Sequence, residues 1–250
     1  MRHESIEKNI GLMTILTLIV VSVGGLVQIV PLFYIDDTVE DVPSVRPYTP
    51  LEQRGRDIYV SEGCYVCHSQ QVRPFRDEQI RYGHYSLAAE SQYSHPFQWG
   101  SKRTGPDLAR VGGKYSNAWH VQHLRYPRTV VPESVMPNYP HLLETELETD
   151  QLKARLRTLK TVGVPYTEKK GERYEKNVER WGKEMAEKLH IPNAQETLRA
   201  EAEAGNYDLQ PDRLTQMDAI VAYLQSLGTM VDFSEYSEPK QGRARGYGES

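Results

Sequence analysis

The hydrophobic pattern divides the chain into one long apolar segment near the N-terminus and a polar remainder. No charged residue occurs between Asn9 and Ile35, and residues 10–34 are long enough to cross a bilayer core of about 30 Å as a helix. The remainder is polar enough to make the mean hydropathy of the whole chain negative. The pattern therefore predicts a short N-terminus over residues 1–9, a transmembrane anchor over residues 10–34 and a water-exposed body.

The residues that flank the apolar segment predict how it crosses the membrane. Arg2 and Lys8 precede the segment, and Asp36 and Asp37 follow it. Because Lys and Arg favour the cytoplasmic side, we expect the N-terminus in the cytoplasm and the body on the outer side. A cleaved signal peptide is the alternative, with an apolar region of about 7–15 residues and a small-x-small cleavage site. This longer segment ends in Pro31-Leu32-Phe33-Tyr34, which favours a retained anchor.

Helical periodicity recurs in the body. Apolar positions predict helices over residues 51–62 and 215–228, and a capping box of Thr215 and Asp218 marks the start of the second helix. A further helix is expected over residues 117–126.

The two ends of the body have a different composition. Three prolines mark residues 35–50 as an extended linker, and the polar, Gly-rich residues 231–250 are expected to form a flexible tail. A domain over residues 51–230 lies between them.

Charged residues dominate residues 167–206, where one apolar stripe repeats every three or four positions. The stripe consists of Tyr174, Val178, Trp181, Met185 and Leu189. This pattern predicts an amphipathic helical insertion whose apolar face packs on the rest of the body or on a neighbouring subunit.

The run Cys64-Tyr65-Val66-Cys67-His68 carries the most specific chemical signal in the chain. Cys-x-x-Cys-His is an attachment motif for a c-type haem, in which the two thiols form thioethers and the imidazole is the proximal ligand of the iron. We therefore predict one covalently bound haem c, attached at Cys64 and Cys67 and ligated by His68. Because c-type haem is attached on the outer side of the bacterial plasma membrane, the motif also predicts an exported body.

A redox dithiol and half of a zinc site are the alternatives for the two cysteines. A dithiol motif is expected within a thioredoxin-like pattern of strands and helices, and a zinc site needs a second pair of ligands. Neither context is present, because Cys64 and Cys67 are the only cysteines of the chain.

Charge and composition exclude other classes of function. The net charge of −4 and the lack of a basic stripe argue against binding to nucleic acid. No internal repeat, Gly-rich phosphate loop or triad-like spacing is present, so no catalytic residue is predicted.

The order of the motifs resembles the class I cytochrome c fold. A helix precedes the Cys-x-x-Cys-His run, Gly105-Pro106-Asp107-Leu108 and a Met-Pro pair follow, and a helix ending in Tyr-Leu-x-x-Leu-Gly closes the domain. The resemblance implies an all-α fold, here with a single N-terminal transmembrane helix and a helical insertion. It also implies that the Pro106 carbonyl accepts a hydrogen bond from His68 and that Leu108 covers the haem. A ligating imidazole needs its second nitrogen held in this way.

Met136 is expected to be the second axial ligand of the iron. It lies between Pro132 and Pro137, whose restricted backbones present a thioether rigidly. Met217 has helical spacing and is expected in the core. The other candidates are Met185, Met230, His84, His95, His120, His123 and His141.

Two further groups of residues each have two interpretations. Arg125 and Arg128 either bind the haem propionates, which suit a guanidinium fork, or lie on the surface. The aromatic side chains of residues 72–104 either contact a partner or fold back on the haem crevice. They are Tyr82, Tyr85, Tyr93, Phe97 and Trp99.

A closer resemblance extends over nearly the whole chain. Residues 67–74, 103–115, 119–128, 135–140 and 159–166 resemble the monohaem subunit, subunit II, of cbb(3)-type cytochrome c oxidases, which are C-family haem-copper oxidases. The resemblance implies an electron-transfer subunit that relays electrons from a dihaem cytochrome c subunit or a soluble cytochrome c to the haem b of the core subunit. Dioxygen reduction and proton translocation then occur in the core subunit during aerobic or microaerobic respiration.

The same resemblance implies a location and leaves two alternatives. The chain is expected to be a single-pass protein of the bacterial inner membrane, with membrane lipid around the anchor and the haem domain in the periplasm. The haem c subunit of a nitric oxide reductase shares these features, although the long segment after Met136 fits it poorly. A free-standing membrane-anchored electron shuttle or haem-based sensor is the second alternative.

Overall fold

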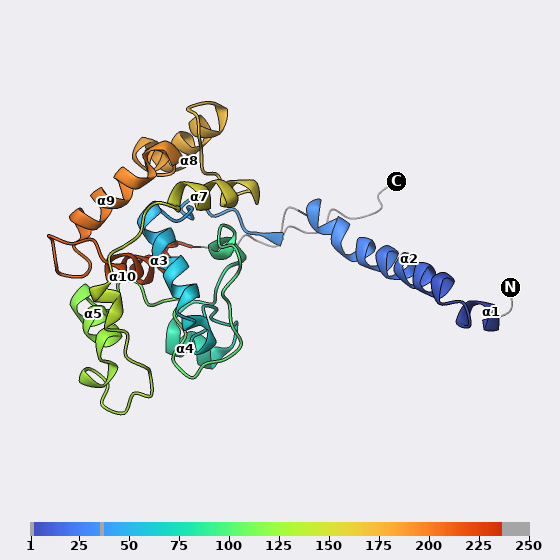
Figure 1. Cartoon of the computed structure of the whole chain (residues 1–250), viewed down its shortest axis with the longest axis horizontal. Helices are drawn as coiled ribbons and strands as arrows, with labels where there is room; N and C mark the ends of the chain where they lie inside the picture. Colours follow the sequence, from blue (N-terminus) through green and yellow to red (C-terminus); the bar gives the residue numbers. More distant parts are fainter. Residues whose placement is uncertain (1–2, 36–37, 237–250) are drawn as a thin grey trace. The chain divides into compact units, whose positions relative to one another are not determined.

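The computed structural model describes residues 3–35 and 38–236 (Figure 1). It divides the chain into two compact units, Met1–Glu40 and Asp41–Ser250. The described residues form helices and loops, with two isolated β-bridges and no strand. The predicted all-α class is therefore confirmed.

The second unit is a helical body. Its α-helices are α3 (Pro50–Ser61), α4 (Arg76–Tyr82), α5 (Asn117–Arg125), α6 (His141–Glu144), α7 (Leu152–Thr161), α8 (Glu172–Lys188), α9 (Ala194–Gly205) and α10 (Gln216–Ser226). Its 3-10 helices are η3 (Cys64–Val66), η4 (Ala88–Ser91), η5 (Pro127–Thr129) and η6 (Ile191–Asn193). The three helices predicted from periodicity correspond to α3, α5 and α10.

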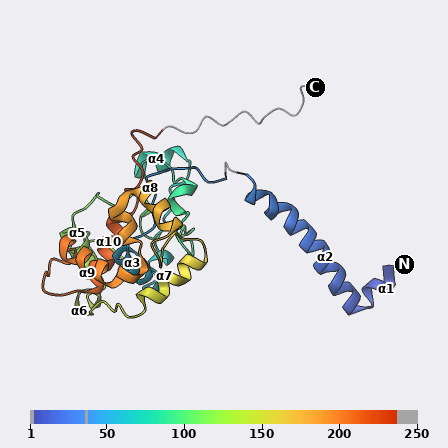
Figure 2. The ribbon, with the colours of Figure 1, turned by 90° about the horizontal axis from the view of Figure 1, so that it is seen from above.

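Helices α3 and α10 cross at the centre of this unit and form its most extensive helix pair (Figures 1 and 2). A Cβ atom at Gly55 would lie 1.8 Å from the carbonyl oxygen of Ala219 and 2.7 Å from the Cβ of Tyr223. Only glycine therefore permits the crossing. Tyr59 and Tyr223 pack edge to face beside it, with ring centroids 5.5 Å apart. Met217 is fully buried on α10, which confirms its predicted place in the core.

Both crossing helices begin with a capping box. Thr49 and Glu52 cap α3, and Thr215 and Asp218 cap α10, as the sequence predicted for the second pair. Each box satisfies backbone N–H groups that a helix start leaves unpaired.

The predicted insertion packs on this core. α9 contacts α3 and α7 (Figure 2), and Leu189, Ile191 and Leu198 belong to the main hydrophobic cluster. The apolar stripe lies on and just after α8, but the helix has a kink at Gly182, where φ is +83°. Glycine adopts this conformation without strain. The apolar pattern continues on both sides of the kink, so the pattern alone does not reveal it.

A second hydrophobic cluster joins distant segments of the chain. It consists of Val42, Val45, Leu87, Ala89 and Val231. Part of the predicted linker and the first residue of the predicted tail therefore pack against the body. Residues 237–250 of that tail, and Arg2, Asp36 and Asp37, lie outside the described residues.

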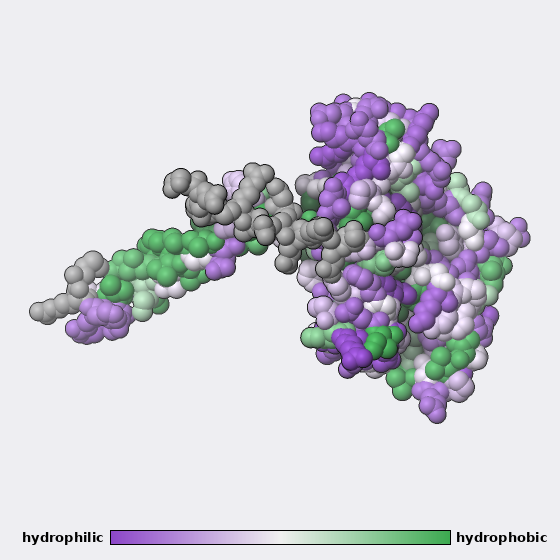
Figure 3. All heavy atoms as spheres, turned by 180° about the vertical axis from the view of Figure 1, so that it is seen from behind, coloured by the Kyte–Doolittle hydropathy of each residue, from purple (hydrophilic) through white to green (hydrophobic). Residues whose placement is uncertain are grey.

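The first unit contains the predicted anchor. α1 spans His3–Glu7, and α2 spans Ile10–Ile29 and continues into η1 at Val30–Phe33. Ile10–Phe33 is long and apolar enough to cross a membrane, and Figure 3 shows its apolar side chains on the surface. Asn9 caps α2, because its side-chain oxygen accepts a hydrogen bond from the N–H of Leu12 at 3.1 Å.

Candidate haem site

A tight turn after α3 brings together the two cysteines and the histidine of the motif. Gly63 turns the chain with φ of +70°, a conformation that favours glycine. Residues 64–66 then form η3, and the N–H of His68 donates a hydrogen bond to the carbonyl of Cys64 at 2.9 Å. Both thiols and the imidazole therefore come from a single turn, as attachment to one porphyrin requires.

The Cys64 thiol lacks the lowered pKa that a reactive dithiol has. Burial, followed by the charge of Glu62, raises the pKa of the Cys64 thiol to about 12, whereas reactive dithiols have lowered pKa values. Within residues 3–35 and 38–236, no group of three or more His, Cys, Asp and Glu side chains is placed to hold a metal ion. The described fold therefore supports neither a redox dithiol nor a closed zinc site.

The imidazole of His68 is held by Pro106. Its Nδ1 lies 2.8 Å from the Pro106 carbonyl oxygen, which is the contact that the resemblance implies. When Nδ1–H donates this hydrogen bond, Nε2 is the nitrogen available to an iron. A Cβ atom at Gly105 would lie 2.2 Å from the Cε1 of His68, so this close approach of the backbone requires glycine.

Met136 lies in a loop that hydrogen bonds hold in place. Its N–H donates to the Oγ of Ser134 at 3.2 Å, and the Nε–H of Arg128 donates to the Ser134 carbonyl at 3.0 Å. The loop returns to α5 at Tyr139, whose N–H donates to the Leu124 carbonyl at 2.9 Å. Arg128 thus supports the Met136 loop directly, a contact that its sequence position does not indicate.

Tyr139 links this loop to the cysteine turn. Cys64, Leu108, Met136 and Tyr139 are half-buried and pack against the main hydrophobic cluster. Burial raises the pKa of Tyr139, and the charges of Cys64, Glu62 and Cys67 raise it further. The cysteine turn and the Met136 loop therefore border the same hydrophobic cluster.

Three of the alternative histidines contact other side chains. His141 Nε2 lies 3.1 Å from the Glu62 carboxylate. The ring of His84 stacks on Phe233 at 4.4 Å, and that of His95 tilts against Phe97 at 5.7 Å.

The other two histidines lie on α5. His120 is buried, and burial followed by the charge of His123 lowers its pKa to about 4. His123 stacks on Trp119 at 4.5 Å, and its pKa is lowered by burial and then by the charge of His68. Burial and the charge of His68 thus both disfavour the protonated form of the half-buried His123 ring.

The remaining alternatives separate into exposed and packed side chains. Arg125 is exposed, with its guanidinium 5.3 Å from the Tyr126 ring centroid. Met185 and Met230 are half-buried and pack against the main cluster.

Three of the aromatic residues in segment 72–104, Tyr93, Phe97 and Trp99, have different surroundings. Tyr93 packs edge to face on Trp181 at 6.1 Å. Phe97 and Trp99 stack on each other at 4.6 Å and are 47% and 42% exposed. Tyr93 therefore packs on α8, whereas Phe97 and Trp99 remain at the surface, and contact of these rings with a haem crevice or a partner stays a prediction.

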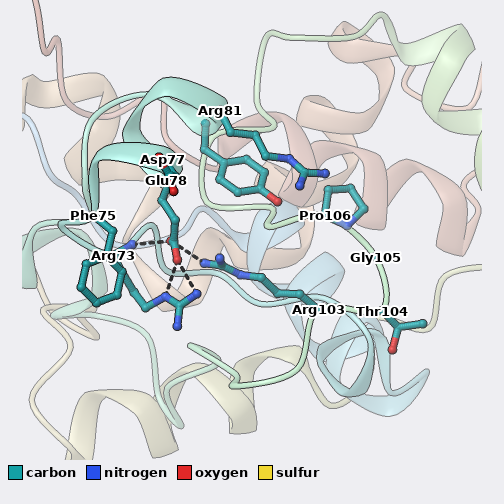
Figure 4. A pocket seen from close by; sticks show the side chains of 10 residues that line it. Arg73, Phe75, Asp77, Glu78, Arg81, Arg103, Thr104, Gly105 and Pro106 are labelled. Atoms are coloured by element: carbon teal, nitrogen blue, oxygen red, sulfur yellow. Dashed lines mark hydrogen bonds and ion pairs between the residues drawn. The ribbon is translucent and has the colours of Figure 1, made fainter.

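A charged network beside Pro106 was not predicted from the sequence. Arg73 and Arg103 both bind the Glu78 carboxylate, and Figure 4 shows the three side chains converging. With Pro106 they line a cavity of about 520 Å³. The hydrogen bond from Arg103 is the main reason that the pKa of Glu78 is lowered to about 2. Arg103 and Glu78 are 25 residues apart, so no local motif signals their pairing.

The site has the donor set of a haem protein. It combines a Cys-x-x-Cys-His turn, an imidazole with one nitrogen held and the other available, and a thioether in a fixed loop. On a helical body these features are typical of the c-type cytochrome class.

Comparison with known proteins identifies the family within that class. The model of the family described as cytochrome c oxidase, mono-heme subunit/FixO matches residues 3–231, so the chain belongs to this family. No curated protein matches the chain. The membership confirms the resemblance to the monohaem oxidase subunit, and haem and electron transport follow from the family. The chain is therefore a subunit of an oxidoreductase complex that contains other subunits.

Proposed function

We propose that this chain is the membrane-anchored electron relay of a cbb(3)-type cytochrome c oxidase. It receives electrons from a dihaem cytochrome c subunit or a soluble cytochrome c and passes them to the haem b of the core subunit. The observation that carries the proposal is the 2.8 Å contact between the Pro106 carbonyl and Nδ1 of His68. His68 directly follows the Cys-x-x-Cys turn. The haem, when bound, supplies an iron that gains and loses one electron.

The residues of the site have distinct proposed roles. Cys64 and Cys67 hold the haem covalently, and His68 and Met136 ligate the iron. Pro106 orients the imidazole. Two protein ligands saturate the iron, so the site suits electron transfer rather than dioxygen binding. The chain is assigned no general acid, base or nucleophile, because dioxygen is reduced in the core subunit.

Three further residues are proposed to contact the haem. Leu108 is half-buried against the main cluster, which supports a role in covering one haem face. Arg125 and Arg128 are assigned to the propionates, since both are exposed near the end of α5.

The proposed location follows from the apolar helix. Residues 1–9 lie in the cytoplasm, residues 10–34 cross the bacterial inner membrane, and the haem domain lies in the periplasm. The length and composition of Ile10–Phe33 support the span, and the Lys and Arg content of the flanks supports the direction.

Metal analysis of the native complex tests this function. The complex is extracted with a mild detergent and purified through this chain, and its metals and optical spectra are recorded. We expect a covalent haem on this chain and a partner that contains copper and a high-spin haem b. Non-haem iron in place of copper would instead indicate a nitric oxide reductase, and a stable monomer would indicate a free-standing shuttle.

A further inference from the structure

The guanidinium of Arg103 lies between two carboxylates behind the loop that holds His68. Its Nη2–H donates to Glu78 Oε2 at 2.8 Å and to Asp107 Oδ2 at 3.3 Å. Its Nε–H donates to the Oγ of Ser69, the residue next to His68, at 2.7 Å. A single side chain therefore connects both carboxylates to the histidine segment.

Asp107 is the centre of this arrangement. Its side chain is fully buried, and it accepts hydrogen bonds from Ser69 Oγ at 2.6 Å, Gln71 N–H at 2.9 Å and Ala109 N–H at 2.8 Å. A buried carboxylate is costly unless a cation and several hydrogen bonds compensate it. Arg103 supplies the positive charge.

The network fixes the distance between two backbone segments. The N–H of Gly105 donates to the Cys67 carbonyl at 3.0 Å, and the N–H of Leu108 donates to the Ser69 carbonyl at 2.8 Å. These bonds lie on either side of the Pro106 carbonyl. Movement of residues 103–109 away from residues 67–71 would therefore also break the hydrogen bond to His68.

Glu78 gives the network a second, separable charge. Arg73 binds it as well, through its backbone N–H at 2.8 Å and through its side chain. Glu78 therefore keeps a cationic partner and its negative charge when Arg103 is replaced. Removing Arg103 and removing Glu78 change the local charge in opposite directions.

We propose that Arg103 is a positioning residue for His68, and that Arg103 and Glu78 together set the reduction potential of the haem iron. The inference rests on the haem ligation proposed above. Arg103 holds the Pro106 carbonyl on the imidazole through Asp107 and Ser69. A positive charge near the iron favours the reduced state, and a negative charge favours the oxidised state.

The test compares variants of opposite charge in the full-length, haem-loaded chain in detergent. Spectroelectrochemical titration of the haem α-band gives the midpoint potential. We expect Arg103→Gln to lower the potential and Glu78→Gln to raise it. Arg103→Lys keeps the charge and should remain closer to the wild type than Arg103→Gln.

A matched variant separates this role from a general loss of stability. Arg46 pairs with Glu52 at 2.7 Å, and its side chain is 22% exposed, as is that of Arg103. It lies near the start of α3, about 18 Å along the helix from the haem turn. Arg46→Gln should lower stability without moving the potential.

Two results would overturn the inference, and neither is confused with failure of the proposed function. If Arg103→Gln and Glu78→Gln move the potential in the same direction or leave it unchanged, the network has only a structural role. If Arg103→Gln does not fold, the inference is tested by Glu78→Gln alone. A Glu78→Gln potential that does not rise above that of the wild type would then overturn the inference. A wild-type chain without covalent haem would instead contradict the proposed function before any variant is compared.

Discussion

In the proposed haem site, Met136 and Gly105 have opposite roles: Met136 is the proposed second ligand, and Gly105 leaves space beside His68. The N–H of Met136 donates to the Oγ of Ser134, and Arg128 holds the same loop through the Ser134 carbonyl. Gly105 lets the backbone pass directly against the His68 ring. Both residues can be changed without altering charge, so their effects report on ligation and geometry.

Met136→Leu removes the thioether and keeps nearly the same volume. The oxidised protein should lose the weak methionine-to-iron absorption band at the red end of the spectrum. The reduced protein should bind carbon monoxide, and the potential should fall. Met185→Leu, a change at a half-buried methionine of α8, should leave all three properties unchanged. A retained band in Met136→Leu would show that another residue is the ligand.

Gly105→Ala places a methyl group where the His68 imidazole lies. Because the added Cβ would be 2.2 Å from Cε1 of His68, we expect a several-fold loss of covalent haem on stained gels. We also expect a loss of about 1–3 kcal/mol in the free energy of unfolding. Gly171→Ala, where the added Cβ meets nothing within 4 Å, is the matched control. Full haem loading in Gly105→Ala would contradict the geometry of the Pro106 contact.

Helix α3 is the element that connects the core to the haem turn. Its start is held by the capping box and by the Arg46–Glu52 ion pair, and its end continues directly into the Cys64–His68 turn. The packing of α3 on α10 and α9 therefore determines where the Cys64–His68 turn lies.

Gly55→Ala tests the crossing of α3 and α10. The new Cβ would meet the Ala219 carbonyl oxygen at 1.8 Å, and backbone atoms of a buried helix cannot move aside easily. We expect thermal unfolding in detergent to show a loss of about 3 kcal/mol or more, because overpacking of a core typically costs 1–3 kcal/mol and a backbone clash costs more. An unchanged midpoint would mean that the two helices are further apart than described.

Glu201 on α9 gives the packing against α3 a pH dependence. Burial, followed by the charge of Glu52, raises the pKa of Glu201 from 4.5 to about 7. The folded chain therefore binds this proton more tightly than the unfolded chain. The contribution of Glu201 to stability is full below about pH 4.5 and is lost as the pH rises through about 7.

Glu201→Gln should therefore stabilise the protein at pH 8 and have little effect at pH 5. The expected gain in the free energy of unfolding at pH 8 is on the order of 2 kcal/mol. This gain is smaller than the free energy that corresponds to the whole pKa shift, because Lys188 loses its ion-pair partner. Thermal unfolding at the two pH values measures it. A gain of the same size at both values would assign the effect to packing instead of charge.

For the whole molecule, the sequence predicted what is local and repetitive. The Cys64–His68 turn, the Thr215 cap and the place of Met217 in the core follow from residues a few positions apart, where spacing dictates geometry. His68 and Pro106 are 38 residues apart, and their contact was predicted only from the resemblance to a known family.

The remaining features depend on tertiary packing. Arg103, Glu78 and Asp107 meet because the loop of residues 103–107 packs against helix α4 beside Pro106, and no periodicity encodes such a meeting. The kink at Gly182 leaves the apolar stripe of α8 intact, so the stripe gives no sign of it. Arg128 has the charge to bind a propionate, but only the fold shows its bond to the Ser134 carbonyl.

The most direct test of the electron relay follows the haem of this chain while the intact complex reduces dioxygen. The fully reduced, detergent-extracted complex is mixed rapidly with dioxygen, and the absorption bands of the covalent haem and of haem b are recorded over time. We predict that the covalent haem is oxidised within one turnover as it re-reduces haem b, and that Met136→Leu slows this step. A covalent haem that stays reduced while the complex consumes dioxygen would contradict the electron relay.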